Sequence, residues 1–324
     1  MANHTHSVAV KSGPKIKSAR KTAMKRIWKY SPLYLMMIPG IAYLLINNYL
    51  PMFGLVIAFK DINFAKGIWG SDWVGLQNFK FLFQTSDAYV ITRNTILYNL
   101  AFIVINLIVG VGLAILLNEI KSKFASRLYQ TVIILPFLIS MVLVSYLVYS
   151  LLSMESGFMN KTILPLLGVG PVSWYNEPKY WPIILTAVEV WKGAGYACII
   201  YLAAIIGIDP EYYEAATLDG ASKWQQIRKI TIPLIMPVII MLTLLAIGRI
   251  FYSDFGLFYQ VPMNSGALFS TTNVIDTYVF RGLLQLGNIG MSAAAGFYQS
   301  LVGFVLVLAS NYIVRKFNKE NALF

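Results

Sequence analysis

Four charged side chains lie inside or beside long apolar stretches of the sequence, where an ionised group has few partners. Glu189 and Lys192 stand three residues apart in one stretch, and Arg249 and Asp254 stand five apart in another. A charge at mid-membrane costs about 2.5–3.5 kcal/mol on insertion scales, so each of these groups requires a partner or a water-filled cavity. Glu189 and Lys192 can pair with each other on one face of a helix.

Arg249 has no such neighbour. On a continuous helix, five residues at about 100° each place Arg249 and Asp254 about 140° apart. The rise of about 1.5 Å per residue places Arg249 and Lys192 between the middle and the outer third of a membrane. We therefore expect Arg249 to find its counter-charge on another segment, on a second subunit or on a bound anion. A guanidinium can bind a carboxylate through two parallel hydrogen bonds.

A polar strip, EYYEAATLDGASKWQQIRKITIPLIMP (211–237), separates two apolar stretches. Asp209 and Pro210 are a favourable N-cap and first residue of a helix. Gly220 suits the left-handed turn that closes a helix. Ser222 and Gln225 have the spacing of a capping box. The strip therefore predicts a helix–turn–helix whose short helices need a surface to pack against, as a docking element would.

Six apolar stretches position these groups. Hydrophobic residues make up 57% of the 324 residues and charged residues only 12%, against about 25% charged residues in soluble domains. A span needs about 20 apolar residues. We predict an all-α membrane protein with spans at roughly 33–58, 94–117, 129–152, 182–206, 234–258 and 292–314. Between the first two spans, WVGLQNFKFLF (73–83) predicts a short helix, either flat on the outer membrane surface or packed on the spans.

Lys and Arg residues gather on one side of the predicted membrane. Eight precede the first span, and further groups follow the second, fourth and sixth spans. Because cytoplasmic loops are enriched in Lys and Arg, we expect both termini and the strip to be cytoplasmic. Residues 1–31 are predicted to be a basic tail that is retained, since no cleavage site follows. Residues 32–324 are predicted to form the membrane domain, with its main cytoplasmic loop at 207–233.

Several classes of function are not expected. The sequence has no G-x-x-x-x-G-K-[ST] phosphate loop, so the chain is not expected to hydrolyse ATP itself. Its two histidines, His4 and His6, lie in the tail, and its one cysteine, Cys198, lies in an apolar stretch. Neither a catalytic group nor a metal site is expected from these residues. The net charge of +12 comes from short segments beside apolar stretches, which does not indicate a nucleic-acid surface.

The strip resembles a known signature. Glu214-Ala215-Ala216, Gly220, Ile230 and Pro233 match E-A-A-x3-G-x9-I-x-L-P, with Ile232 in place of the leucine. This pattern is the signature loop of permease subunits of bacterial ABC importers. The segments WVGLQNFKFLF (73–83), IDTYVFRGLL (275–284) and NYIVRKFNKENALF (311–324) resemble the permeases that import complex oligosaccharides.

The resemblance implies a non-enzymatic permease subunit in the bacterial inner membrane. It implies no cofactor in this chain, with ATP and magnesium held by two separate ATPase subunits. A second permease subunit, completing a heterodimer, and an extracytoplasmic solute-binding protein are the other implied partners. The strip would dock on an ATPase subunit through Glu214, Ala215, Ala216, Asp219, Gly220, Ala221, Ile230 and Pro233.

The resemblance also implies an oligosaccharide substrate, and an acidic one, such as an alginate fragment, fits Arg249. Our candidates for the lining of the substrate pathway are Glu189, Trp191, Lys192, Arg249 and Asp254. The alternatives are a self-neutralised Glu189–Lys192 pair, a Trp191 that faces lipid or packs in the core, and an Arg249 salt bridge across a subunit interface. An ion-coupled secondary transporter is the alternative function, although the inverted repeat that often marks that class is not evident between residues 1–160 and 161–324.

Overall fold

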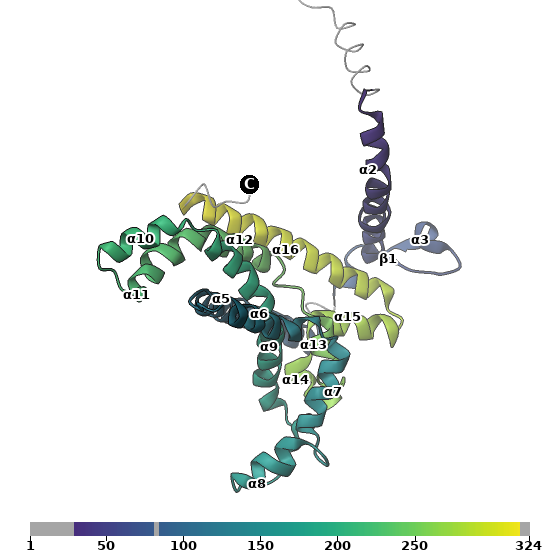
Figure 1. The fold of residues 1–324 in the computed structure, drawn as a ribbon. Helices are drawn as coiled ribbons and strands as arrows, with labels where there is room; N and C mark the ends of the chain where they lie inside the picture. Colours follow the sequence, from purple (N-terminus) through teal and green to yellow (C-terminus); the bar gives the residue numbers. More distant parts are fainter. Residues whose placement is uncertain (1–28, 81–83, 318–324) are drawn as a thin grey trace, which may run out of the picture. The chain divides into compact units, whose positions relative to one another are not determined.

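The computed structural model describes residues 29–80 and 84–317, which are mostly helical (Figure 1). Within the described residues, five helices are long and apolar enough to cross a membrane, and a bent helix pair supplies a sixth candidate. The predicted all-α membrane fold is therefore confirmed. The chain forms two compact units, Met1–Val56 and Ile57–Phe324. Most of the predicted basic tail lies outside the described residues.

The first unit holds most of one candidate span, Ser31–Phe59. It begins with α2 (Ser31–Leu44), continues as the π-helix η1 (Leu45–Tyr49) and ends in the 3₁₀ helix η2 (Leu50–Phe59), which crosses into the second unit. Pro51 has no backbone N–H to donate, so a regular α-helical ladder cannot continue through it. The change from π to 3₁₀ geometry at Leu50 therefore coincides with the proline.

The second unit is built around two long helices. α5 (Ser86–Asn118) packs along α9 (Trp181–Ile206), and α6 (Lys123–Leu138) packs on the other side of α9. A Cβ atom on Gly195 would lie 2.0 Å from the Ile133 carbonyl oxygen. Only glycine permits this approach, which follows the preference for small residues where membrane helices touch. Buried apolar clusters surround Trp181 near the start of α9 and Cys198 nearer its end.

The predicted span at 129–152 is interrupted. α6 ends at Leu138, and α7 (Met141–Leu152) begins at an angle of 95° to it. The Ser140 hydroxyl accepts a hydrogen bond from the Leu143 N–H at 3.4 Å and so starts a new helix. The break could not be predicted from the apolar composition, because a bent span and a straight span are equally apolar.

The predicted span at 234–258 is displaced toward its N-terminus. The helical run Lys223–Gly248 contains α11 (Lys223–Gln226), the π-helix η7 (Ile227–Thr231) and α12 (Ile232–Gly248). Arg249 follows in a turn, so the angle derived for a continuous helix through Asp254 does not apply. The later helices are α13 (Phe255–Gln260), η8 (Gly266–Leu268), α14 (Phe269–Thr272), α15 (Ile275–Leu284) and α16 (Ile289–Phe317).

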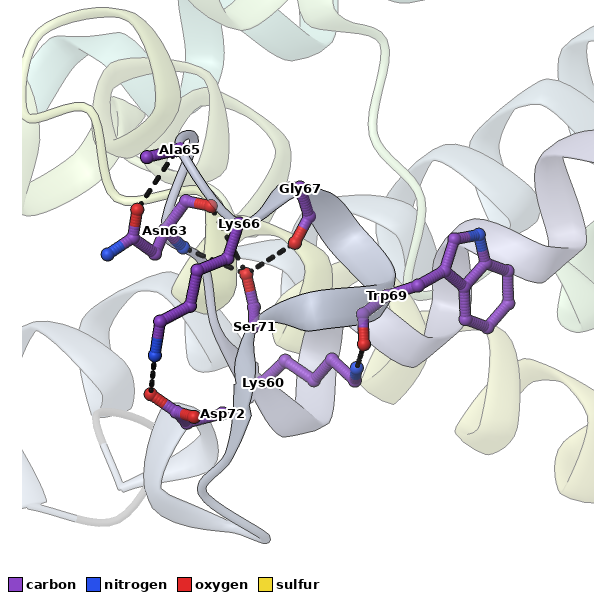
Figure 2. A network of polar contacts seen from close by, with 8 residues as sticks. All are labelled: Lys60, Asn63, Ala65, Lys66, Gly67, Trp69, Ser71 and Asp72. Atoms are coloured by element: carbon purple, nitrogen blue, oxygen red, sulfur yellow. Dashed lines mark hydrogen bonds and ion pairs between the residues drawn. The ribbon is translucent and has the colours of Figure 1, made fainter.

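A compact polar network stabilises the segment after the first span (Figure 2). β1 (Lys60–Asp61) pairs antiparallel with β2 (Asp72–Trp73), and α3 (Gly67–Gly70) lies between them in sequence. The Lys60 side chain is buried, and its ammonium donates to the carbonyl oxygens of Ile68 at 3.0 Å and Trp69 at 2.9 Å. The Ser71 hydroxyl donates to the Gly67 carbonyl oxygen at 2.7 Å and accepts from the Asn63 N–H at 3.0 Å.

The short helix predicted for 73–83 is not formed in the described part of that range. Trp73 belongs to β2, and only Gln77–Phe79 is helical, as the single 3₁₀ turn η3. The Asn78 amide donates to the Ala58 and Lys60 carbonyl oxygens at 3.1 and 2.9 Å. These hydrogen bonds connect residues 77–79 to the β1–β2 hairpin. Because Trp73 pairs in β2 and Asn78 binds the hairpin, the continuous helix expected from the spacing of the apolar residues does not form. The remaining short elements are η4 (Met159–Ile163), α8 (Leu164–Leu166), η5 (Trp174–Asn176) and η6 (Pro178–Tyr180).

Candidate functional site

The polar strip folds as the helix–turn–helix predicted from its capping residues. α10 (Pro210–Leu218) begins after Asp209, whose carboxylate accepts the Glu211 N–H at 3.0 Å. Gly220 has a φ of +75°, the left-handed conformation that closes helices. Ser222 and Gln225 form a complete capping box at the start of α11.

Side chains join the two halves of the strip and fix it to the rest of the unit. The Tyr213 hydroxyl lies 3.0 Å from the Thr231 hydroxyl, and the Gln226 amide donates to the Thr217 hydroxyl at 2.9 Å. The Lys223 ammonium lies 3.3 Å from the carboxylate of Glu119, the residue that caps the end of α5. The strip is therefore a preformed element connected to α5 and, through η7, directly to α12.

The strip exposes large apolar side chains. Leu218, Trp224 and Tyr212 are 89%, 69% and 57% exposed, and α10 and α11 lie together beyond the start of α12 (Figure 1). Exposed apolar groups rimmed by polar residues are typical of protein-binding surfaces. Of the predicted coupling residues, Glu214 and Ala215 are exposed on α10, and Pro233 is exposed at the start of α12. The others line a cavity of about 340 Å³: Ala216, Asp219, Gly220, Ala221 and Ile230.

Lys192 and Glu189 do not form the ion pair that was one of the sequence-based alternatives. The Lys192 side chain instead binds the break between α6 and α7. Its ammonium donates to the carbonyl oxygens of Pro136 at 3.2 Å, Phe137 at 2.9 Å and Ile139 at 2.5 Å. These oxygens lie at the end of α6, where a helix leaves carbonyl oxygens without regular helical partners. The Pro136 oxygen also accepts the Ile139 N–H at 3.2 Å. Unsatisfied backbone groups are costly in a membrane. One lysine of α9 thus donates to three carbonyl oxygens at the 95° bend.

Glu189 lines a cavity of about 300 Å³ between α5, α9 and α12. The Asn106 side chain lies beside it, and the Asn106 Oδ1 atom is buried without a hydrogen-bond partner among the described residues. Tyr196 lines the same cavity and stacks on Phe137 with ring centroids 4.8 Å apart. The cavity thus combines amide, carboxylate and aromatic groups. Its other polar lining residues are Asn99, Tyr201 and Thr243.

The structure does not bring the other predicted pathway residues to this cavity. Trp191 lines a separate apolar groove with Val144 and Val148 of α7, on the side away from Glu189. Arg249 is exposed as the C-cap of α12. Asp254 is the N-cap of α13 and accepts the Leu257 N–H at 2.9 Å, which is a structural role. Of the five residues, only Glu189 lines this cavity.

A buried network holds the break that follows α12. The Asp276 carboxylate accepts the Ser253 N–H at 2.8 Å and the Gln299 amide at 3.3 Å, and that amide also donates to the Phe251 carbonyl oxygen at 2.7 Å. Burial raises the pKa of the Asp276 carboxyl, while these hydrogen bonds oppose the shift. The network joins the break to both α15 and α16. Arg249 is therefore the first residue of a turn that these hydrogen bonds hold in place.

Two cavity residues could have been found from the sequence. Asn99 and Asn106 are seven residues apart within one predicted span, which places both amides on one face of a helix. Thr243 had no comparable signal, because it comes to the cavity from a different helix.

Known proteins share this architecture. Residues 106–319 match the family described as binding-protein-dependent transport system inner membrane component. The chain belongs to this family. It is a membrane-spanning permease subunit of the ABC importer class, so its role is transport and not catalysis.

Individual relatives extend the match beyond the family segment. The chain is 36% identical over 304 residues to the polygalacturonan/rhamnogalacturonan transport system permease protein YteP of Bacillus subtilis (strain 168), covering 94% of each protein. It is 35% identical to protein LplB of the same strain, covering 89% of this chain and 90% of LplB. A chain in the crystal structure of a bacterial ABC transporter involved in the import of the acidic polysaccharide alginate matches with a TM-score of 0.84 and 33% identity. That match covers 92% of this permease and 99% of the other chain.

Proposed function

We propose that this permease forms half of an ATP-driven pathway that imports an acidic oligosaccharide. The observation that carries the proposal is the preformed helix–turn–helix at residues 209–231, which bears the importer signature and exposes Leu218 and Trp224. Two ATPase subunits would supply ATP and magnesium. A second permease subunit would complete the pathway, and an extracytoplasmic solute-binding protein would deliver the substrate.

The contacts of the strip support a coupling role. A partner that moves α10 would move α12 through η7 and would pull on α5 through the pair of Lys223 and Glu119. Both α5 and α12 line the Glu189 cavity. A displacement of the strip would thus move α5 and α12, two of the helices that line the Glu189 cavity. On this proposal the strip and both termini face the cytoplasm, consistent with the distribution of Lys and Arg.

The relatives favour an acidic saccharide. The matching structure is that of an importer of alginate, an acidic polysaccharide, and YteP belongs to a polygalacturonan/rhamnogalacturonan transport system. Lys192 is engaged by backbone oxygens, so Arg249 is the remaining cation among the predicted pathway residues, and it forms no ion pair within 4.0 Å in the described part of the chain. We propose that the Arg249 guanidinium contacts a substrate carboxylate. A salt bridge to the second permease subunit is the alternative.

Uptake into proteoliposomes tests this function. The complete importer is reconstituted with its solute-binding protein, and entry of an alginate oligosaccharide is followed with ATP inside the vesicles or with an ion gradient alone. We expect uptake with ATP and none with the gradient. Uptake driven by the gradient without ATP would instead establish an ion-coupled secondary transporter.

A further inference from the structure

We propose that a groove beside Arg93 binds the phosphate headgroup of an anionic phospholipid. The groove has a volume of about 350 Å³ and lies between α5, α9 and α14. Its lining residues are Arg93, Asn94, Leu97, Tyr98, Thr186 and Thr271, with Ala101 and Pro182. Neither the coupling strip nor the Glu189 cavity includes any of these residues.

The groove and the Glu189 cavity lie on opposite faces of α5. Arg93, Leu97 and Ala101 follow one another at intervals of four, so they form a single stripe along the helix. Asn99 and Asn106 of the cavity point about 160–180° away from Leu97, the middle of that stripe, at about 100° per residue. The groove is therefore separate from the polar cavity that the proposed pathway uses.

Arg93 stands at the boundary of the apolar part of its span. It is the last charged residue before an uncharged stretch that runs from residue 94 to residue 118. Those 25 residues span about 37 Å at 1.5 Å per residue, which is enough for the hydrocarbon core. Tyr89, one turn earlier, is 70% exposed, and its ring lies 5.8 Å from the Arg93 guanidinium. An exposed tyrosine beside an arginine is typical of the headgroup level of a membrane.

The guanidinium is held in place without being neutralised. It donates to the Asn94 Oδ1 atom at 2.9 Å and to the Ser270 carbonyl oxygen at 3.0 Å. Neither acceptor is charged, and no carboxylate lies within 4.0 Å of Arg93 among the ion pairs of residues 29–80 and 84–317. A guanidinium fixed by neutral acceptors keeps its full charge for a phosphate, which it can bind through two hydrogen bonds.

The deeper part of the groove suits an acyl chain. Leu97 is 57% exposed, and the stripe from Arg93 to Ala101 extends about 12 Å into the apolar region at the helical rise. Tyr98 is 7% exposed, and its hydroxyl is buried without a hydrogen-bond partner in the described residues. Arg93 and Tyr89 form a polar end, and the apolar stripe of Leu97 and Ala101 continues from it. This arrangement matches an amphipathic lipid more closely than a soluble anion. The orientation proposed above places this lipid in the outer leaflet.

The experiment counts lipids on the purified importer complex by native mass spectrometry. The complex is exposed to phosphatidylglycerol or to phosphatidylcholine, which has no net charge. We expect retention of phosphatidylglycerol and about a tenfold lower occupancy in Arg93→Gln, the size of effect that one charge-assisted contact gives. Ala101→Phe leaves the guanidinium in place but fills the groove, so it should lower occupancy as well. Lys179→Gln, an exposed cation at the same end of α9, is the matched control and should retain the lipid.

Two results would overturn the proposal. One is equal retention of the two lipids by the wild-type complex. The other is equal retention of phosphatidylglycerol by all four proteins; if Arg93→Gln and Ala101→Phe then also lose saccharide uptake, the groove would be assigned to the substrate.

Discussion

The Lys192 ammonium on α9 lies 2.5 Å from the carbonyl oxygen of Ile139, the residue at which α6 gives way to α7. Two further carbonyl oxygens of the same break accept from this ammonium. Phe137, whose carbonyl oxygen is one of them, stacks on Tyr196 in the wall of the Glu189 cavity. Lys192 thus positions a bend that shapes one side of that cavity.

Replacing Lys192 with methionine should destabilise the assembled complex. The substitution removes the ammonium donor from the Phe137 and Ile139 carbonyl oxygens, while the Pro136 oxygen keeps the Ile139 N–H. Each buried unsatisfied group costs about 1–3 kcal/mol. We expect a lower midpoint of thermal denaturation for Lys192→Met, and a smaller loss for Lys192→Arg, which keeps several donors. Lys179→Met removes an exposed lysine away from the bend and serves as the control. A Lys192→Met complex as stable as the Lys179→Met complex would contradict the positioning role.

Substitutions in the strip should uncouple ATP hydrolysis from transport. Gly220→Leu imposes a side chain on a left-handed residue, and Glu214→Leu alters the exposed face of α10. We expect both to weaken docking of the ATPase or to reduce the substrate-stimulated ATPase activity of the reconstituted complex. Gly168→Leu is a matched control, because Gly168 also has a positive φ, of +69°, with open space around it. Wild-type assembly and stimulation in both strip variants would refute the coupling assignment.

Replacing Arg249 with glutamine should affect acidic substrates selectively. Loss of one charge-assisted contact costs about 1.5–3 kcal/mol, which corresponds to a loss of about tenfold or more. Uptake of an acidic and a neutral oligosaccharide is compared in the same vesicles. Equal loss for the two, or failure of the complex to assemble, would assign Arg249 to the subunit interface.

The sequence predicted those features that depend on local chemistry. The caps at Asp209 and Ser222 and the turn at Gly220 formed as expected, because each is decided within a few residues. The bend after Leu138 and the end of α12 at Gly248 were not predicted, since apolar composition does not distinguish a straight span from a broken one. The pairing of Glu189 with Lys192, one of the alternatives that the sequence left open, is not formed, because three carbonyl oxygens at the end of α6, distant in sequence, bind the ammonium.

The complete importer should contain one copy of this chain and one copy of a different permease. Six spans and one strip supply half of a pathway and one docking site, whereas two ATPase subunits are expected. Native mass measurement of the purified complex gives the composition directly. Two copies of this chain with no second permease would establish a homodimer instead.

Cross-linking at the strip tests the central claim that an ATPase subunit docks on α10. A cysteine is placed at Leu218, the most exposed of the apolar residues on α10 and α11, after Cys198 has been replaced with serine. The matched control places the cysteine at Leu286, which is 76% exposed between α15 and α16, on the side predicted to face outward. We predict that a cysteine-reactive bifunctional reagent joins the Leu218→Cys chain to the ATPase subunit and does not join the Leu286→Cys chain. Absence of that product in an assembled, active complex, or equal yield from the two positions, would contradict the account.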